Sequence, residues 1–179
     1  MKIAVYCGSG TGNKPNVISK TVELGNWIGK NGHTLIYGGG DEGLMGIIAK
    51  TVYKYGNEVI GVLPGNVDFI ANRTQSYCTQ VIKASNMNVR KQTMLEMADV
   101  FIALPGGIGT LDEISEAITL TKIGVFDKPC ILYDVDEFYQ GFKSFLETMI
   151  QSEFLRAAEI KKVLFSQDVD EIEQFIRKG

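Results

Sequence analysis

Short runs of consecutive apolar residues recur along the chain, each followed by a longer stretch in which apolar residues return every three or four positions. A short continuous apolar run indicates a strand buried on both faces, whereas the longer spacing indicates a helix with one buried side. This alternation predicts strands at Lys2–Cys7, His33–Tyr37, Glu58–Leu63, Cys78–Lys83, Val100–Leu104, Pro129–Tyr133 and Val163–Phe165.

The stretches between these runs predict helices whose ends carry recognisable signals. Pro15 suits a first helical turn, Asn31-Gly32 and Gly56 suit helix ends, and Ser85 suits an N-cap. The predicted helices run over Pro15–Lys30, Gly43–Tyr55, Ser85–Met97, Leu111–Lys122, Asp136–Gln151 and Asp168–Arg177. Residues 64–76 show no clear periodicity and are interpreted as an irregular loop that could cover a site.

Strands that alternate with helices over the whole chain indicate an α/β fold. We expect a Rossmann-like, doubly wound parallel sheet of about six or seven strands with helices on both faces. At 179 residues, with no repeat and no linker-like stretch, residues 1–179 are expected to form a single nucleotide-binding domain.

Composition and charge narrow the range of partners. The chain is 45% hydrophobic and 22% charged, with a net charge of −3, so nothing draws it generally to nucleic acid or to an anionic membrane. The N-terminal apolar run is too short for a signal peptide, and no stretch approaches the roughly 20 apolar residues of a membrane span. Three widely spaced cysteines without a C-x-x-C pair are typical of buried, reduced thiols, so we expect a cytoplasmic protein with no metal site and no cofactor.

The stretch Pro105–Thr110 is the strongest candidate for a binding site. It follows the buried run Val100–Leu104, contains three glycines and precedes a predicted helix. The free N–H groups and positive dipole end of such a helix bind anions, and phosphate is the obvious guest. Thr110 and Glu113 have the spacing of a capping box, so Glu113 could simply cap this helix. The glycines, likewise, could only form a tight turn.

The residues Pro105-Gly106-Gly107-Ile108-Gly109-Thr110-Leu111-Asp112-Glu113 match P-G-G-x-G-T-x-x-E, the motif of the Lonely Guy (LOG) family. The chain resembles this family elsewhere too. Similar segments are Cys7-Gly8-Ser9, Tyr37-Gly38-Gly39-Gly40 with Gly43-Leu44-Met45-Gly46, Met87-Asn88-Val89-Arg90-Lys91, and Gly124 with Asp127-Lys128-Pro129. Together they cover roughly residues 1–154. Many members were formerly labelled lysine decarboxylases.

The resemblance implies an enzyme that hydrolyses cytokinin riboside 5′-monophosphates to the free base and ribose 5-phosphate. The family's catalytic arginine and glutamate fall on Arg90 and Glu113. A carboxylate can stabilise the positive charge that builds on the ribose, and an arginine can clamp hydroxyls or orient that carboxylate. The implied substrate- and phosphate-binding residues are Ser9, Gly39, Gly40, Lys91, Gly106, Gly107, Gly109 and Thr110.

Some of these residues have plainer interpretations, and the sequence departs from the family pattern in two places. Arg90 and Lys91 could form a solvated helix face, and Met87, Met94 and Met97 are expected in the core. Asn88 replaces the usual histidine of M-H-x-R-K. Asp41-Glu42 place two carboxylates in a glycine loop, where they could contact the base or ribose or repel a phosphate. The only histidine, His33, is not expected to be catalytic.

Two other functions remain open on the sequence. A non-catalytic nucleotide or cofactor carrier could share this fold, although such relatives often lack the paired arginine and glutamate. An amino-acid decarboxylase would need a cofactor such as pyridoxal phosphate, for which no lysine context is found.

The resemblance also implies a homodimer with an active site near the subunit boundary. The predicted helix at Leu111–Lys122 gives modest support, because it is apolar over more of its circumference than one sheet-facing stripe requires. The expected contact residues are Met94, Met97, Ile114, Ala117, Ile118, Leu120, Thr121 and Ile123.

Overall fold

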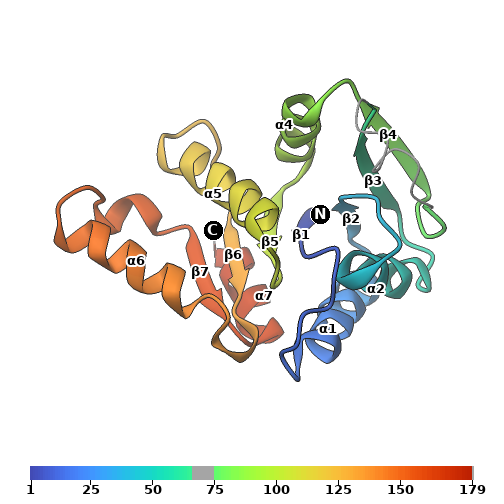
Figure 1. The fold of residues 1–179 in the computed structure, drawn as a ribbon, viewed down its shortest axis with the longest axis horizontal. Helices are drawn as coiled ribbons and strands as arrows, with labels where there is room; N and C mark the ends of the chain where they lie inside the picture. Colours follow the sequence, from blue (N-terminus) through green and yellow to red (C-terminus); the bar gives the residue numbers. More distant parts are fainter. Residues whose placement is uncertain (66–74, 179) are drawn as a thin grey trace.

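The computed structural model describes residues 1–65 and 75–178, which form a three-layer α/β structure around a seven-stranded parallel sheet (Figure 1). The strand order is β4-β3-β2-β1-β5-β6-β7, and every neighbouring pair is parallel. The strands are β1 Lys2–Tyr6, β2 Thr34–Tyr37, β3 Val59–Pro64, β4 Gln80–Ala84, β5 Val100–Ala103, β6 Cys130–Tyr133 and β7 Val163–Ser166. The predicted doubly wound fold is therefore confirmed.

The helices cover both faces of this sheet. The helices are α1 Val17–Lys30, α2 Gly43–Tyr53, α4 Met87–Met97, α5 Ile108–Lys122, α6 Gln140–Gln151 and α7 Val169–Lys178, with 3₁₀ turns at Val135–Glu137 and Ala157–Ile160. Helices α1 and α2 pack side by side, and α7 contacts α1 on the same face (Figure 1). Helices α4 and α5 cover the opposite face, together with the start of α6.

Alternate residues of the central strands supply the two hydrophobic cores. In β1, Ile3 and Val5 point toward α1 and α2, whereas Ala4 and Tyr6 point toward α4 and α5. All four side chains are almost fully buried. This two-sided burial explains why the central strands are continuous apolar runs rather than alternating ones.

Most predicted elements are shifted by only one or two residues, but two helix starts differ by more, because α5 begins at Ile108 and not at Leu111, and α6 at Gln140 and not at Asp136. Helix α1 begins at Val17, not at Pro15. The stretch predicted as one helix from Asp136 is a 3₁₀ turn followed by α6, because Asp136 and Glu137 have positive φ angles of 54° and 58°. The Asp136 carboxylate there accepts hydrogen bonds from the backbone N and side-chain Nδ2 of Asn16, at the start of α1.

Three further sequence predictions can be placed on the fold. The predicted loop at 64–76 falls mainly on residues 66–74, outside the described residues; Pro64 belongs to β3. His33 packs edge-on against Trp27, away from the strand ends where glycine loops meet. Cys7, Cys78 and Cys130 are free thiols, of which Cys130 alone is fully buried. No helix in the described part of the chain has the length and apolar character needed to cross a membrane.

Candidate active site

The carboxyl ends of β1 and β5 meet where the order of the strands reverses. From β1 the chain continues through β2, β3 and β4 on one side, and from β5 through β6 and β7 on the other. The two loops that leave these strands are joined, because the Gly8 amide donates to the Pro105 carbonyl over 3.1 Å. In doubly wound sheets this switch point is where ligands bind.

Helix α5 begins directly after the loop that leaves β5, and its first turn is open. Gly107 is its N-cap and has no side chain, so the first amides of α5 keep their hydrogen-bonding capacity. A Cβ at Gly106 would lie 2.2 Å from Oγ1 of Thr110, so only glycine lets the loop turn this tightly against the helix. By contrast, the space above Gly107 and Gly109 is open.

The predicted capping box at this helix is wrong. Thr110 lies inside α5 rather than at its N-cap, and no side chain caps the helix. The Glu113 carboxylate instead accepts a hydrogen bond from Arg90. Helix α5 therefore has no side chain that caps its N-terminus, and its Glu113 carboxylate is bound by Arg90 of another helix.

Arg90 reaches this glutamate from α4. The N-cap of α4 is Asn86, whose side chain accepts from the Val89 amide, and not Ser85 as predicted. Only 8% of Arg90 is exposed. Its Nε donates to the Val62 carbonyl at 2.9 Å and its Nη1 to Glu113 Oε1 at 2.6 Å. Two anchors on different elements therefore fix the guanidinium, and Arg90 is not part of a solvated face.

Burial and charge act on Glu113 in opposite directions. Desolvation raises the pKa of the Glu113 carboxyl above its usual value, and the Arg90 guanidinium opposes this rise. Tyr6 and Cys7 lie close enough for the glutamate charge to raise the pKa of both groups, in addition to the effect of their burial. The Glu113 carboxylate is therefore largely shielded from water, and Arg90 is the cation that interacts with it most strongly.

These groups surround a cavity of about 310 Å³. Its lining residues are Cys7, Gly8, Ser9, Gly38, Met45, Met87, Arg90, Lys91, Gly107, Gly109, Thr110, Asp112 and Glu113. The structure thus brings together seven of the ten predicted site residues: Ser9, Arg90, Lys91, Gly107, Gly109, Thr110 and Glu113. Gly39 and Gly40 are buried and are not among the residues that line this cavity, and Gly106 lines a neighbouring one.

Sequence reasoning missed several residues of this cavity. Met87 was expected in the core, but it is 39% exposed and lines the cavity; Met94 is fully buried, as expected. Gly38 approaches Arg90 so closely that a Cβ would lie 2.8 Å from Nη2. Its place in the glycine loop after β2 was the available signal. The departures Asp41, Glu42 and Asn88 do not line the cavity, and Asp41 accepts a hydrogen bond from the Ser76 amide.

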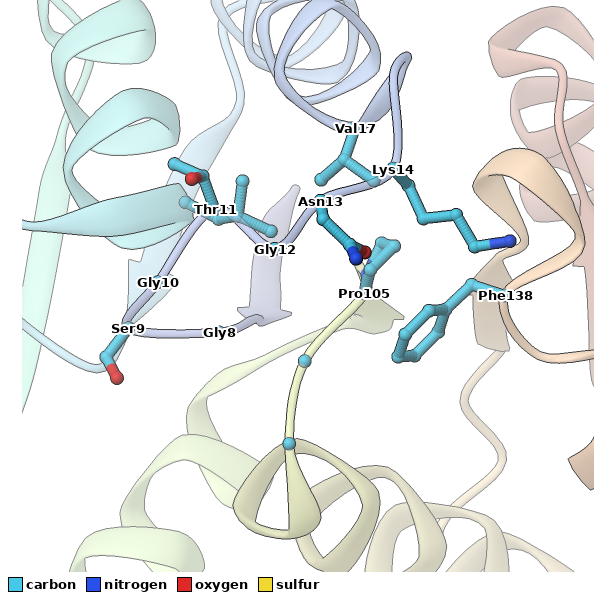
Figure 2. Close-up of a pocket in the computed structure, with 13 residues that line it drawn as sticks. Gly8, Ser9, Gly10, Thr11, Gly12, Asn13, Lys14, Val17, Pro105 and Phe138 are labelled. Carbon is cyan, nitrogen blue, oxygen red and sulfur yellow. The ribbon is translucent and has the colours of Figure 1, made fainter.

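A second cavity of about 260 Å³ adjoins the first (Figure 2). It shares Gly8, Ser9 and Gly107 with the first cavity. The Gly8–Asn13 loop runs along one wall, with Pro105 and Phe138 opposite it (Figure 2). Of these shared residues, Gly107 is the N-cap of α5, and Gly8 and Ser9 belong to the loop that leaves β1.

Within residues 1–65 and 75–178, no group of three or more histidine, cysteine, aspartate or glutamate side chains is arranged to hold a metal ion. The groups around the first cavity include the buried Glu113 carboxylate, the buried Arg90 guanidinium and the backbone amides at the start of α5.

Comparison with curated proteins gives consistent matches. Cytokinin riboside 5′-monophosphate phosphoribohydrolase LOG from Oryza sativa subsp. japonica is 40% identical over 92% of this chain and 67% of that protein. The corresponding LOG2 from Arabidopsis thaliana is 34% identical over 99% of this chain and 83% of that protein. This chain spans only 61% of another rice relative, the probable phosphoribohydrolase LOGL6.

Solved structures share the fold. A molybdenum cofactor binding protein from Rippkaea orientalis has a TM-score of 0.74 and 23% identity, covering 99% of this chain and 95% of that chain. The molybdenum cofactor carrier protein from Chlamydomonas reinhardtii has a TM-score of 0.72 and 23% identity over 98% of both chains. A structural-genomics target reaches 0.76 and 26%, covering 99% of both chains.

The family model described as "Possible lysine decarboxylase" matches residues 45–176, which include α4, the glycine turn after β5 and α5. Together with the two LOG proteins above, this match decides the family. The chain belongs to the LOG family, the group to which that decarboxylase description is attached.

Proposed function

We propose that this chain is a nucleoside 5′-monophosphate phosphoribohydrolase. It would cleave the N-glycosidic bond of cytokinin-type adenosine 5′-monophosphates and release the free base and ribose 5-phosphate. The observation that carries this proposal is the Arg90–Glu113 pair, 2.6 Å apart in a cavity that also contains the open N-terminus of α5. The names of the relatives that it matches describe this reaction.

The two charged groups suit the chemistry of base release. As the N-glycosidic bond breaks, positive charge builds on the ribose, and a preorganised carboxylate in a dry site stabilises it strongly. Glu113 is the group in position to do this and to orient the attacking water. Arg90 holds Glu113 ionised, against the effect of burial, and leaves further donors for ribose hydroxyls.

The start of α5 is proposed as the site for the 5′-phosphate. The amides of Gly107, Gly109 and Thr110, with the Ser9 hydroxyl nearby, can donate to phosphate oxygens. Gly106 contributes by making the tight turn, and Gly39 and Gly40 by shaping the loop that brings Gly38 to Arg90. Glu113 lies about one helical turn further along α5, which separates the phosphate site from the bond that breaks.

We also propose a homodimer, with its active sites near the subunit boundary. Of the contact residues expected from the sequence, Met94, Ile114, Ala117 and Ile118 are buried within one chain and Ile123 is exposed. The exposed apolar residues beside the cavity are instead Met87 and Val89 on α4 and Ile108 on α5. A second copy that covers them would lie directly beside Arg90 and Glu113.

Three coarser features complete the proposal. One domain is proposed because all seven strands belong to a single sheet. A cytoplasmic location is proposed because three free thiols suit a reducing compartment. The proposed partners are the nucleotide substrate and a second copy of the chain, with no nucleic acid, given the net charge of −3. Because the proposed reaction on this substrate releases a free cytokinin base, we also propose that the protein acts in cytokinin biosynthesis.

The direct test is to incubate the protein with AMP, isopentenyladenosine monophosphate, zeatin riboside monophosphate and the matching nucleosides, and to measure free base. We expect free base to be released from the monophosphates only, because the proposed site binds the substrate through contacts between its phosphate and the amides at the start of α5. Glu113→Gln keeps the shape but removes the charge, and we expect its rate to fall at least about 100-fold, the scale of a lost electrostatic stabiliser. Arg90→Ala is expected to fall similarly, with circular dichroism confirming that each variant folds.

Nucleotide binding without base release would support the carrier function instead. Equal rates with adenosine and AMP would contradict the phosphate site, and near-normal turnover in Glu113→Gln would contradict the catalytic assignment.

A further inference from the structure

Lys91 follows Arg90 on α4 and makes a second contact between α4 and α5. Its Nζ lies 2.9 Å from Oδ2 of Asp112 and 3.1 Å from Oε2 of Glu116. Asp112 and Glu116 are four residues apart on α5, so both carboxylates lie on one face of that helix. The Lys91 side chain is 17% exposed, and its ammonium sits between the two carboxylates.

This arrangement leaves Lys91 poorly suited to hold a phosphate. Its ammonium donates a hydrogen bond to Asp112 Oδ2, and Glu116 Oε2 lies within ion-pair distance of the same ammonium. The local charge is one cation against two anions, so the cluster as a whole repels a phosphate rather than attracting it. The contacts of Lys91 with Asp112 and Glu116 raise the pKa of its ammonium, so these acids favour its charged form.

The two contacts between α4 and α5, Arg90–Glu113 and Lys91–Asp112, involve neighbouring residues on both helices. Adjacent residues on α4, Arg90 and Lys91, face adjacent residues on α5, Glu113 and Asp112. Any roll of α4 about its axis would move both cations away from their partners together. Arg90 alone has its other anchor on β3, at the Val62 carbonyl, and that anchor does not fix the position of α5.

We propose that Lys91 is a positioning residue of the proposed phosphoribohydrolase, whose ion pairs with Asp112 and Glu116 lock α4 against α5 so that Arg90 faces Glu113. This inference rests on the proposed function and goes beyond it. It removes Lys91 from the phosphate site and gives a role to two carboxylates of α5 that do not themselves act on the substrate.

The role predicts a loss of turnover rather than of substrate binding. With the lock broken, Arg90 shifts relative to Glu113 and stabilises both the ribose charge and the ionised glutamate less well. A misplacement of about 1 Å can cost up to 100-fold in rate; we expect Lys91→Met to lower kcat by about tenfold, with KM changed less than about twofold. Lys91→Arg keeps a cation between two acids and should restore most of the turnover.

The decisive experiment compares Lys91→Met, the double variant Asp112→Asn/Glu116→Gln and the triple combination, using AMP-type substrate and the wild-type chain. Lys20→Met, which removes an exposed ion pair with Glu23 on α1, is the matched control. We expect Lys91→Met and the double variant to lose kcat equally, and the triple to lose no more than either, because all three break the same contact. The control should match the wild type.

The pH profile separates positioning from simple charge effects. The charged and titratable groups that face Glu113 are Arg90 and Lys91 from α4, Tyr6 from β1, Cys7 just after β1, and Asp112 on α5 itself. By charge alone, removing Lys91 raises the pKa of Glu113 and removing the Asp112 charge lowers it. A broken lock loosens Arg90 in both variants, so the acid limb of the kcat profile should move to higher pH in both.

Two results would overturn the positioning role. A rise in KM for Lys91→Met alone, with kcat unchanged, would show that Lys91 contacts the phosphate. Opposite shifts of the acid limb in Lys91→Met and the double variant would show a charge effect without positioning. If the wild-type chain releases no base from any nucleotide, the proposed function fails. The lock is then tested by nuclear magnetic resonance titration of the Glu113 carboxyl, whose pKa should rise in both variants; an unchanged value contradicts it.

Discussion

At Glu113, burial and the neighbouring Arg90 charge shift the pKa of one carboxyl group in opposite directions. Its carboxyl group is largely buried, and burial is the main cause of its raised pKa, with Arg90 as the main opposing influence. The same environment that makes the charge costly makes it effective, because electrostatic interactions strengthen where water is excluded.

The pH dependence of activity follows from this environment. The ionised form of Glu113 is the active one, and its raised pKa means that protonation begins at a higher pH than for an ordinary glutamate. We expect kcat to fall on acidification with an apparent pKa above 4.5, the usual value. A pH–rate profile with the preferred nucleotide measures this. An acid limb below 4.5 would contradict the dominance of burial.

The raised pKa of Glu113 should affect folding stability in the opposite direction to activity, so that stability falls as pH rises. Because the folded-state pKa is higher than the unfolded one, ionising Glu113 costs folding free energy, so its contribution falls as pH rises through the interval between the two values. Urea titrations of the wild type and Glu113→Gln between pH 4 and pH 7 should show the wild type losing stability relative to the variant.

Gly38 tests how finely Arg90 is placed. A Cβ there would lie 2.8 Å from both Arg90 Nη2 and Met45 Sδ, which are the ends of flexible side chains. The fold can therefore accommodate Gly38→Ala, but Arg90 must move. We expect base release to fall about tenfold or more with little change in melting temperature. Gly10→Ala, where no atom lies within 4 Å, is the matched control and should keep its rate.

At the scale of elements, close contact between α1 and α2 stabilises one half of the crevice. A Cβ at Gly25 of α1 would lie 2.8 Å from Cβ of Thr51 on α2. Because that atom sits near the α2 backbone, the helices would have to separate. Helix α2 follows the loop that contains Gly38, so this packing also supports the site.

Paired glycine substitutions in helices measure this packing. Gly25→Ala should lower the free energy of unfolding by about 1–3 kcal/mol, the usual cost of overpacking. Gly141→Ala in α6, where no atom lies within 4 Å, should raise it by up to about 1 kcal/mol through helix propensity. Both are read from urea unfolding midpoints. A stabilised Gly25→Ala would mean that α1 and α2 can separate at no cost.

At the scale of the whole molecule, the proposed dimer is the feature that would complete the site. Val89 is 39% exposed on α4, one residue from Arg90. We expect multi-angle light scattering to show a dimer, and Val89→Glu to shift it toward monomer, with activity per chain falling as it dissociates. Phe154→Glu changes an 83% exposed residue just after α6 and should leave the dimer intact. A fully active wild-type monomer would contradict the shared site.

The overall fold could be predicted because it depends on regular patterns. Continuous apolar runs identified the buried strands, and the strand–helix alternation identified the parallel sheet. The motif around Pro105–Glu113 identified the glycine turn, and the family resemblance identified Arg90 and Glu113 as the expected catalytic residues. Helix starts were less predictable. Thr110, Ser85 and Pro15 each carried a local signal, but α5, α4 and α1 begin at Ile108, Met87 and Val17, because neighbouring residues offer competing local signals such as the Asn86 cap of α4.

The sequence alone determined the order of the elements, the position of the glycine turn and the residue types available for chemistry, because these follow from local pattern and spacing. Only the tertiary structure decided that Glu113 pairs with Arg90 instead of capping α5, and that Lys91 lies between Asp112 and Glu116. These contacts join residues more than 20 positions apart on two helices, and only the packing of α4 and α5 on one face of the sheet brings them together.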